Sequence, residues 1–195
     1  MSGNPLSTSN DTNKYIHMPR IDPINTATAT QEQQDLLANV KKSMGMVPNL
    51  VSTMAHSPAV ANAYLSFNGA LAKGVLSPQM REKISLTVGQ ANECDYCVSA
   101  HSVLGKVAGL SPEEVIAARR ATCSCDKTSA ALGFAAKIVK NRGLVSDDDV
   151  AGLRTAGWND AEITEIVANT ALNIFTNYFN HVAGTAIDFP SAPKL

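Results

Sequence analysis

Three serine–proline pairs mark helix starts along this chain. They are Ser57-Pro58, Ser77-Pro78 and Ser111-Pro112. Serine is a favoured N-cap because its hydroxyl accepts a hydrogen bond from a free N–H of the first turn, and proline fits the first helical position. Each pair therefore predicts a helix that begins at the proline. The helices expected from these pairs cover residues 58–72, 78–91 and 112–121.

Four N-cap residues are followed by a polar partner three positions later, a pattern that also predicts helix starts. These pairs are Thr30 with Gln33, Ser111 with Glu114, Ser146 with Asp149, and Asn159 with Glu162. The additional helices expected cover about 30–44, a short stretch after Pro48, 93–108, 127–141, a stretch from 146, and 161–186. No segment shows sustained alternation of apolar and polar residues, so we expect no sheet. The predicted fold class is all-α.

The composition favours a single-domain helical bundle. The chain has 195 residues, of which 45% are hydrophobic and 17% charged, and this suits one domain with a sizeable core. Residues 1–20 are rich in Ser, Thr and Asn, which predicts a polar N-terminal tail or arm, with the all-α domain spanning 21–195. The helix at 161–186 is apolar on nearly every side. Such a helix predicts packing against its own bundle and against another subunit, hence a homo-oligomer.

Charge and hydropathy exclude several classes of partner. The formal net charge is −1 and no basic stripe is present, so neither nucleic acid nor an anionic membrane is expected. No run approaches the roughly 18 consecutive apolar residues of a membrane span, and the N-terminus lacks the features of a secretory signal. We therefore expect a cytoplasmic protein whose partner is a small molecule or another protein.

Residues 94–101 concentrate the reactive side chains of the chain. Cys94, Cys97 and His101 project from one face of a helix, within a sector of roughly 60°. Cys97 and His101 are four residues apart, which places an imidazole where it is able to take a thiol proton. Asn92 is the expected N-cap of this helix, so Cys94 is expected in the first turn, where free N–H groups favour a thiolate.

Glu82 is the predicted partner of His101. If the chain doubles back at about residue 91, Glu82 lies ten residues before the turn and His101 nine residues after it, so the two come level. A carboxylate beside an imidazole beside a thiol is an arrangement in which the acid orients the base and the base activates the nucleophile. In a reducing compartment, a Cys-x-x-Cys pair indicates catalysis or metal binding.

This stretch resembles the alkylhydroperoxidase D branch of the carboxymuconolactone decarboxylase superfamily. The family pattern is Glu, eleven residues, Cys-x-x-Cys, three residues, His, and Glu82, Cys94, Cys97 and His101 match it at every position. The resemblance implies that Cys97 is peroxidatic, Cys94 resolving, His101 the base and Glu82 its partner. The best-known members have histidine directly before the second cysteine, whereas this chain has Tyr96 there. That departure leaves open whether residue 96 handles protons.

The resemblance also implies the reaction and the partners. We expect a thiol-dependent peroxidase that reduces hydrogen peroxide or organic hydroperoxides through the cysteine pair, without a metal or another cofactor. A dithiol protein, of lipoyl or thioredoxin-like type, would then reduce the disulfide. The family forms trimers or trimers of dimers, so a trimer or hexamer is expected.

Two other functions are compatible with the same residues. The first is a disulfide reductase or redox relay with little peroxide chemistry. The second is a non-catalytic helical oligomer, in which Cys94, Cys97 and His101 only pack or hold zinc with Cys123 or Cys125 as fourth ligand. We otherwise expect Cys123 and Cys125 to be structural or incidental, because one intervening residue strains a mutual disulfide. His181 is expected to be a core or interface residue.

Overall fold

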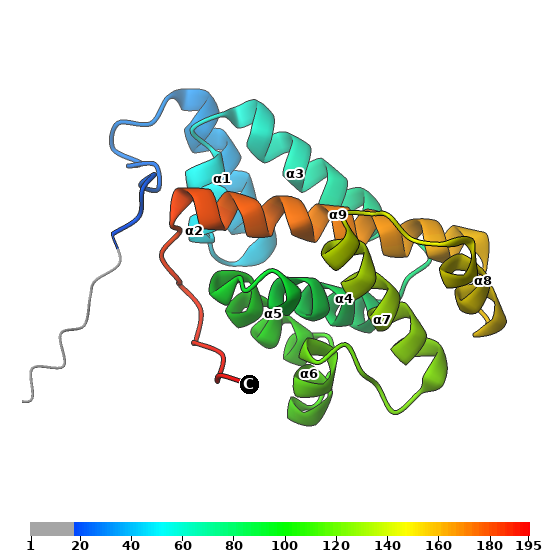
Figure 1. Ribbon diagram of the computed structural model, residues 1–195. Helices are drawn as coiled ribbons and strands as arrows, with labels where there is room; N and C mark the ends of the chain where they lie inside the picture. Colours follow the sequence, from blue (N-terminus) through cyan, green and yellow to red (C-terminus); the bar gives the residue numbers. More distant parts are fainter. Residues whose placement is uncertain (1–17) are drawn as a thin grey trace, which may run out of the picture.

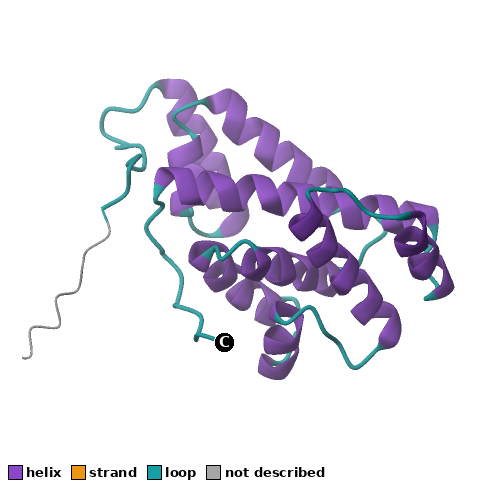
Figure 2. Ribbon diagram, in the orientation of Figure 1, coloured by secondary structure: helices purple, strands orange, loops and turns teal. Residues whose placement is uncertain are grey.

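The computed structural model describes residues 18–195, and every regular element within that range is a helix (Figures 1 and 2). The predicted all-α fold is thereby confirmed. The helices are α1 (Gln31–Met44), α2 (Asn49–Met54), α3 (Pro58–Leu71), α4 (Pro78–Ala91), α5 (Asp95–Val107), α6 (Pro112–Arg119), α7 (Asp126–Asn141), α8 (Asp147–Thr155) and α9 (Asp160–Ala183).

The predicted helix starts are confirmed in most cases. The hydroxyls of Ser57, Ser77 and Ser111 each accept a hydrogen bond from a backbone N–H of the first turn, with proline at the first helical position. Complete capping boxes open α1, α6, α8 and α9. Local hydrogen-bonding chemistry therefore sets most of the element boundaries of this fold.

Helix α4 is the central element of the bundle. It contacts α5, α6, α7 and α9, and Figure 1 shows it lying with α5 beneath the long α9. Half of its 14 residues are buried, among them Ile84, Leu86 and Val88 with no exposed surface. Burying one such aliphatic side chain stabilises the fold by about 1.5–3 kcal/mol. A helix enclosed by four others gives fixed support to any reactive side chain that it carries.

Two hydrophobic clusters make up the core, and the α4–α5 hairpin lies between them. One cluster joins α4 to α6, α7, α8 and α9, with Ile84, Leu132 and Ile166 among its fully buried members. The other joins α1, α2 and α5, and both Cys94 and Cys97 belong to it. The cysteine pair therefore sits on the hairpin where the two clusters meet.

The turn between α4 and α5 differs from the prediction. Asn92 is the C-cap of α4 and not the N-cap of α5, and Glu93 follows it with a left-handed φ of 56°. The N–H of Glu93 bonds to the carbonyl of Gln90, and that of Cys94 to the carbonyl of Gly89. These two bonds form the motif that commonly closes a helix at its C-terminus. Because Asn92 is used to end α4, the cap of α5 passes to Cys94.

Helix α9 also differs from the prediction, because one of its faces is polar. It ends at Ala183, earlier than the expected residue 186, with Gly184 in the left-handed conformation as its cap. The face turned toward α4 and α5 carries a stripe of buried asparagines: Asn169, Asn173, Asn177 and Asn180. Its exposed face carries apolar residues, namely Val167, Phe175, Tyr178 and Val182.

The predicted tail of residues 1–20 lies mostly outside the described residues. At the beginning of the described range, the Arg20 backbone N–H donates to the Ala183 carbonyl, and its guanidinium donates to the His181 carbonyl at 2.6 Å. This contact fixes the start of the described chain against the C-terminal end of α9. Within residues 18–195, no helix combines the length and apolar character needed to cross a membrane.

Candidate active site

The hairpin turn places the two cysteines in different positions relative to α5. Cys94 is the N-cap, and its sulfur accepts a hydrogen bond of 3.3 Å from the backbone N–H of Cys97. Cys97 lies in the first turn, and each residue is only 3% exposed. The expectation that Cys94 occupies the first turn was wrong, because α5 begins two residues later than predicted. It is therefore Cys97 that has the first-turn position expected to favour a thiolate.

Glu82 and His101 come level across the hairpin, as predicted. His101 Nδ1 lies 2.8 Å from Glu82 Oε2, and both side chains are about a fifth exposed, at 22% and 20%. Burial alone would lower the pKa of His101, but the charge of Glu82 and its hydrogen bond outweigh burial and raise it. The bond at Nδ1 orients the imidazole ring and leaves Nε2 as the nitrogen that Glu82 does not occupy.

Two asparagines of α9 act on the sulfur of Cys97. Asn180 Nδ2 donates to Cys97 Sγ at 3.2 Å. Asn177 is oriented by Asn92, whose Nδ2 donates to Asn177 Oδ1 at 2.8 Å. This bond directs the NH₂ group of Asn177 away from Asn92, and within residues 18–195 that NH₂ group has no hydrogen-bond partner. The Asn177 side chain helps to lower the pKa of the Cys97 thiol.

The surroundings push the pKa values of the two thiols apart. A hydrogen bond from Cys94, with further contributions from Asn180 and the charge of His101, lowers the pKa of Cys97 to about 7 against the opposing effect of burial. The same hydrogen bond, together with burial, raises the pKa of Cys94. At neutral pH Cys97 therefore has a much larger thiolate fraction than a thiol with the ordinary pKa of about 8.5.

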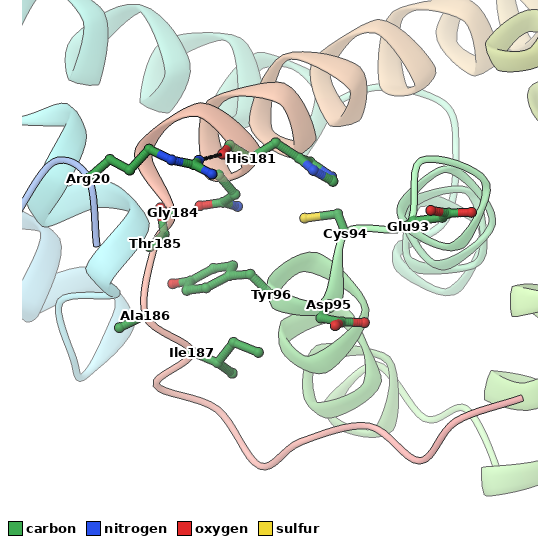
Figure 3. Close-up of a pocket in the computed structure, with 11 residues that line it drawn as sticks. Arg20, Glu93, Cys94, Asp95, Tyr96, His181, Gly184, Thr185, Ala186 and Ile187 are labelled. Carbon is green, nitrogen blue, oxygen red and sulfur yellow. Dashed lines mark hydrogen bonds between the residues drawn. The ribbon is translucent and has the colours of Figure 1, made fainter. Parts of the chain in front are cut away.

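Two hollows lie beside these residues. The larger is a groove of about 520 Å³, into which the Cys94 sulfur points between His181 and the segment that follows α9 (Figure 3). The smaller is a pocket of about 50 Å³, lined by Glu82 and His101 together with Tyr64. Cys94 and the carboxylate–imidazole pair therefore face different hollows, and Cys97 lines neither of them.

Comparisons with known proteins show what the chain is similar to. Residues 58–141 match the model of the carboxymuconolactone decarboxylase family. A peroxidase-related protein with an alkylhydroperoxidase AhpD core, from Ralstonia eutropha JMP134, superposes with a TM-score of 0.78 at 26% identity, covering 87% of this chain and 92% of that one. These two likenesses support the resemblance to the alkylhydroperoxidase D-like branch of the carboxymuconolactone decarboxylase superfamily.

Other solved structures share the fold at lower identity. A peroxidase-related protein from Silicibacter sp. TM1040 has a TM-score of 0.74 at 24% identity and covers 85% of this chain and 91% of that one. The debrominase Bmp8 has a TM-score of 0.72 at 21% identity, with coverage of 86% and 91%. No curated protein matches the chain. This alkylhydroperoxidase D-like fold therefore also occurs in a debrominase.

Tyr96 stands where the best-known alkylhydroperoxidase D-like proteins have histidine, and its hydroxyl makes a structural hydrogen bond. The hydroxyl accepts a hydrogen bond of 3.2 Å from the backbone N–H of Leu50 in α2. Its ring meets that of Phe189 edge to face, with centroids 5.8 Å apart. Burial raises the pKa of this hydroxyl well above its usual value. Tyr96 thus ties α5 to α2 and to the C-terminal segment.

Three residues near the sulfur escaped the sequence-based prediction. Asn177 and Asn180 sit on a helix that was interpreted from its apolar residues alone, although asparagines recur there with helical spacing at 169, 173, 177 and 180. The third is Tyr64 of α3, whose pKa is raised to about 12, mainly by burial and further by the negative charges of Cys97 and Glu82. Tyr64 stays protonated at neutral pH and adds a hydroxyl to the smaller pocket.

The remaining candidates lie apart from this centre or differ from expectation. All four cysteines are free thiols, with Cys123 partly exposed and Cys125 exposed at the N-cap of α7. His181 is exposed and lines the groove, so it is not in the core, and the alternative place at an interface stays a prediction. Within residues 18–195 no three His, Cys, Asp or Glu side chains group in a way that would hold a metal ion.

Proposed function

We propose that this protein is a thiol-dependent peroxidase that reduces hydrogen peroxide or organic hydroperoxides. The observation that carries the proposal is the setting of Cys97. Its sulfur accepts a hydrogen bond from Asn180, lies beside the thiol of Cys94, and is exposed to the charge of His101, which Glu82 holds at 2.8 Å. Nucleophile, resolving thiol and proton-handling pair are thus assembled on one hairpin.

The oxidative steps follow from these positions. The Cys97 thiolate attacks one oxygen of the O–O bond, which breaks to leave a sulfenic acid on Cys97 and an alkoxide or hydroxide. His101 first receives the thiol proton and later protonates the departing oxygen, with Glu82 orienting and polarising its ring. The Cys94 thiol then condenses with the sulfenic acid, which forms a disulfide and releases water. The substrate takes up two electrons in the overall change.

The smaller pocket supports approach of the peroxide from the His101 side. Its 50 Å³ provide room for hydrogen peroxide, since a bound water needs roughly 10–15 Å³ on the same measure. Tyr64 and Thr176 line this pocket with hydroxyl groups beside His101. These groups are suited to hydrogen-bond a peroxide while the imidazole handles the proton.

The exposed apolar residues of α3 and α9 support a homo-oligomer. Ala61 is the only buried residue of the apolar helix α3, whereas Phe67 is exposed. Apolar surface of this kind marks interaction sites. We propose that the protein is a trimer or hexamer. We also propose that it works in the reducing environment of the cytoplasm, where a dithiol protein is its electron donor. Light scattering that found only monomer at micromolar concentration would contradict the assembly.

A trapping experiment tests the peroxidase directly. The Cys94→Ser variant removes the resolving thiol, so one equivalent of peroxide is expected to leave a sulfenic acid on Cys97 that reacts with dimedone. The Cys97→Ser variant serves as the matched control, and we expect neither a dimedone adduct nor turnover with it. Full turnover by Cys97→Ser, or a dimedone adduct confined to another cysteine, would refute the assignment.

A disulfide reductase or redox relay is the second candidate. It is supported by the groove that leads to Cys94 and by the opposed pKa shifts of the two thiols, because such shifts also drive thiol–disulfide exchange. The two functions are separated by comparing the rate of thiol oxidation by hydrogen peroxide with the rate for an unfolded protein disulfide. Faster reaction with the protein disulfide would favour the relay.

A further inference from the structure

A lysine, a glutamate and a cysteine meet between α4, α6 and the segment that joins α6 to α7. Lys83 Nζ lies 2.9 Å from Glu114 Oε1 and 3.9 Å from Cys123 Sγ. All three residues line a cavity of about 170 Å³. Among the described residues, those that line this cavity include none that the proposed peroxide reduction uses. The cluster is therefore a second place where a thiol has a reactive neighbour.

We propose that Cys123 is an oxidation site whose product is captured by Lys83. Peroxide converts the Cys123 thiol to a sulfenic acid, and the Lys83 amine then forms a sulfur–nitrogen bond with it. The resulting sulfenamide joins α4 to the segment between α6 and α7. The proposal does not depend on the peroxidase function, because peroxide acts here only as the oxidant of a further thiol.

Lys83 is held in place before any reaction. Its side chain is only 12% exposed, and Glu114 holds its Nζ through one carboxylate oxygen. Glu114 is itself fixed, because its other oxygen accepts a hydrogen bond of 3.0 Å from the Ser111 backbone N–H in the capping box of α6. Lys83 therefore gives up little further side-chain freedom when it bonds to the sulfur.

The distance between the two reacting atoms suits an intramolecular reaction. Groups that are held about 3–3.5 Å apart react as if each were at a very high concentration. The 3.9 Å between Lys83 Nζ and Cys123 Sγ is only slightly longer, and the flexible four-carbon stem of lysine is able to close it. Cys123 is partly exposed, so peroxide has access to its sulfur. The amine is thus positioned to react before a thiol from solution arrives.

Each step of the chemistry balances. The Cys123 sulfur attacks one oxygen of the peroxide, the O–O bond breaks, and the sulfur loses two electrons as sulfenic acid and water form. Lys83 passes one proton to water, and its nitrogen attacks the sulfenic sulfur, whose hydroxyl leaves as water with a second proton. Two molecules of a thiol reverse the link, restore the thiol and the amine, and form a disulfide between themselves. The link therefore protects Cys123 from irreversible oxidation to sulfinic acid.

The alternative partners of Cys123 are less suitable. A disulfide with Cys125 is strained, because only one residue separates the two cysteines. Lys127 follows Cys125 by two residues, but its Nζ lies over the ring of Trp158, 4.3 Å from the ring centroid. Lys83 is therefore the favoured partner of the oxidised sulfur.

Peptide mapping of the full chain tests the cross-link. The protein is treated with a tenfold molar excess of hydrogen peroxide, free thiols are blocked, and a tryptic digest is analysed by mass spectrometry. Because trypsin does not cleave after a modified lysine, the cross-link should keep residues 82–106 in one peptide, joined to residues 121–127. The joined peptide should weigh two hydrogen atoms less than the sum of its parts. A disulfide between these segments would leave the bond after Lys83 open to trypsin.

Lys83→Arg is the matched control, because arginine keeps the positive charge for Glu114 but is not a nucleophile at neutral pH. We expect the joined peptide to disappear in this variant and the sulfinic acid of Cys123 to rise by about tenfold. Peroxide turnover should stay within twofold of the wild type. If Lys83→Arg does not fold, Cys123→Ser replaces it and should likewise lose the joined peptide.

The wild-type digest decides the proposal on its own. The joined peptide should be a major product at tenfold excess and nearly absent after one equivalent, because Cys97, with its lowered pKa, consumes the first equivalent. A Cys123–Cys125 disulfide, a sulfinic acid on Cys123, or an unmodified Cys123 as the main product at tenfold excess would overturn the proposal.

A variant without the catalytic pair separates this inference from the proposed function. Cys94→Ser combined with Cys97→Ser should lose peroxide turnover and still form the link between Lys83 and Cys123. Loss of the link in this variant, with helical circular dichroism unchanged, would overturn direct oxidation of Cys123. A wild type that forms the link without turning over peroxide would refute the proposed function alone.

Discussion

The chain contains two cysteine pairs, and the structure treats them differently. Cys94 and Cys97 are buried on the central hairpin, where the amide of Asn180 and the imidazole of His101 act on the second sulfur. Cys123 and Cys125 lie in the segment before α7, the first partly exposed and the second exposed. The two pairs thus allow the effect of the surroundings to be compared within one protein.

A low thiol pKa does not by itself distinguish the two pairs. The backbone N–H of Thr128 lowers the pKa of Cys125, which caps α7. However, the neighbours that set this pKa are Thr128, Lys127 and Asp126, and none of them is an imidazole. Cys125 therefore has a lowered pKa but no imidazole among these neighbours to protonate a departing oxygen. Cys123 is too close in sequence to form an unstrained disulfide with it. The proposed peroxide reduction uses a thiolate, a proton donor and a second thiol, and only the Cys94–Cys97 pair has all three.

The strongest test of this comparison exchanges sulfur for oxygen in each pair. Cys97→Ser is expected to reduce peroxide turnover at least 1,000-fold, because a serine hydroxyl is almost entirely protonated at neutral pH and is a weak nucleophile. Cys125→Ser is expected to stay within twofold of the wild type. The turnover of both variants is measured as steady-state peroxide consumption, with dithiothreitol as the reductant. A large loss in Cys125→Ser would show that the exposed pair takes part.

Removing the charge of Glu82 is expected to have the next largest effect. Glu82→Gln keeps a similar shape but loses the negative charge beside His101, so the pKa of His101 falls and its proton is held less well. We expect peroxide reduction to slow by about 100-fold, in the range typical of disrupted general acid–base catalysis. Glu113→Gln, at an exposed carboxylate, is the matched control. An unchanged rate in Glu82→Gln would remove Glu82 from the mechanism.

Converting Asn180 to aspartate tests the hydrogen bond to the sulfur. Asn180→Asp replaces an N–H donor by a negative charge at the same place, so the thiolate of Cys97 loses a bond to a charged group, worth about 1.5–3 kcal/mol, or about 1–2 pKa units. A thiol is deprotonated above its pKa. The rate of Cys97 alkylation by iodoacetamide should therefore be half-maximal near pH 7 in the wild type. In the variant the midpoint should move to higher pH.

At pH 7 this shift leaves roughly 5- to 50-fold less Cys97 thiolate, and peroxide oxidation is expected to slow to the same extent. Asn62→Asp, at an exposed position on α3, adds the same charge away from the site and is expected to change neither the midpoint nor the rate. A midpoint that stays near pH 7 in Asn180→Asp would show that the amide does not stabilise the thiolate.

The smallest expected effect concerns Tyr96, directly before the reactive cysteine. Tyr96→Phe removes the hydroxyl that accepts from the buried Leu50 N–H, so the free energy of unfolding is expected to fall by about 1–3 kcal/mol. Peroxide turnover is expected to stay within twofold. Tyr178→Phe, at a hydroxyl on an exposed side chain, is the control for urea denaturation. A loss of activity larger than the loss of stability would give Tyr96 a role in proton handling.

Much of the fold was predictable because helix starts depend on local chemistry. Ser77-Pro78 and the capping box of Asn159 with Glu162 need only neighbouring residues, and both are found as predicted. The register of Glu82 with His101 was also predictable, since it follows from counting residues on either side of one turn. These features are fixed within short segments of the sequence.

The rest of the site depends on contacts between distant segments. Asn180 is 83 residues from Cys97 in sequence, and nothing local indicates that it meets the sulfur. The start of α5 was misplaced because Asn92 suits both the end of one helix and the start of the next, and the bonds from Glu93 and Cys94 back to α4 decide between them. Tertiary packing thus determines which cysteine has the lower pKa.

The central claim is that peroxide reacts at Cys97 and that Cys94 completes the disulfide. The most direct measurement is mass spectrometry of the protein after one equivalent of hydrogen peroxide, with free thiols blocked before digestion. We predict a Cys94–Cys97 disulfide in nearly every chain, reversed by dithiothreitol, while Cys123 and Cys125 remain thiols. Oxidation concentrated at Cys125, with Cys94 and Cys97 still reduced, would contradict the account.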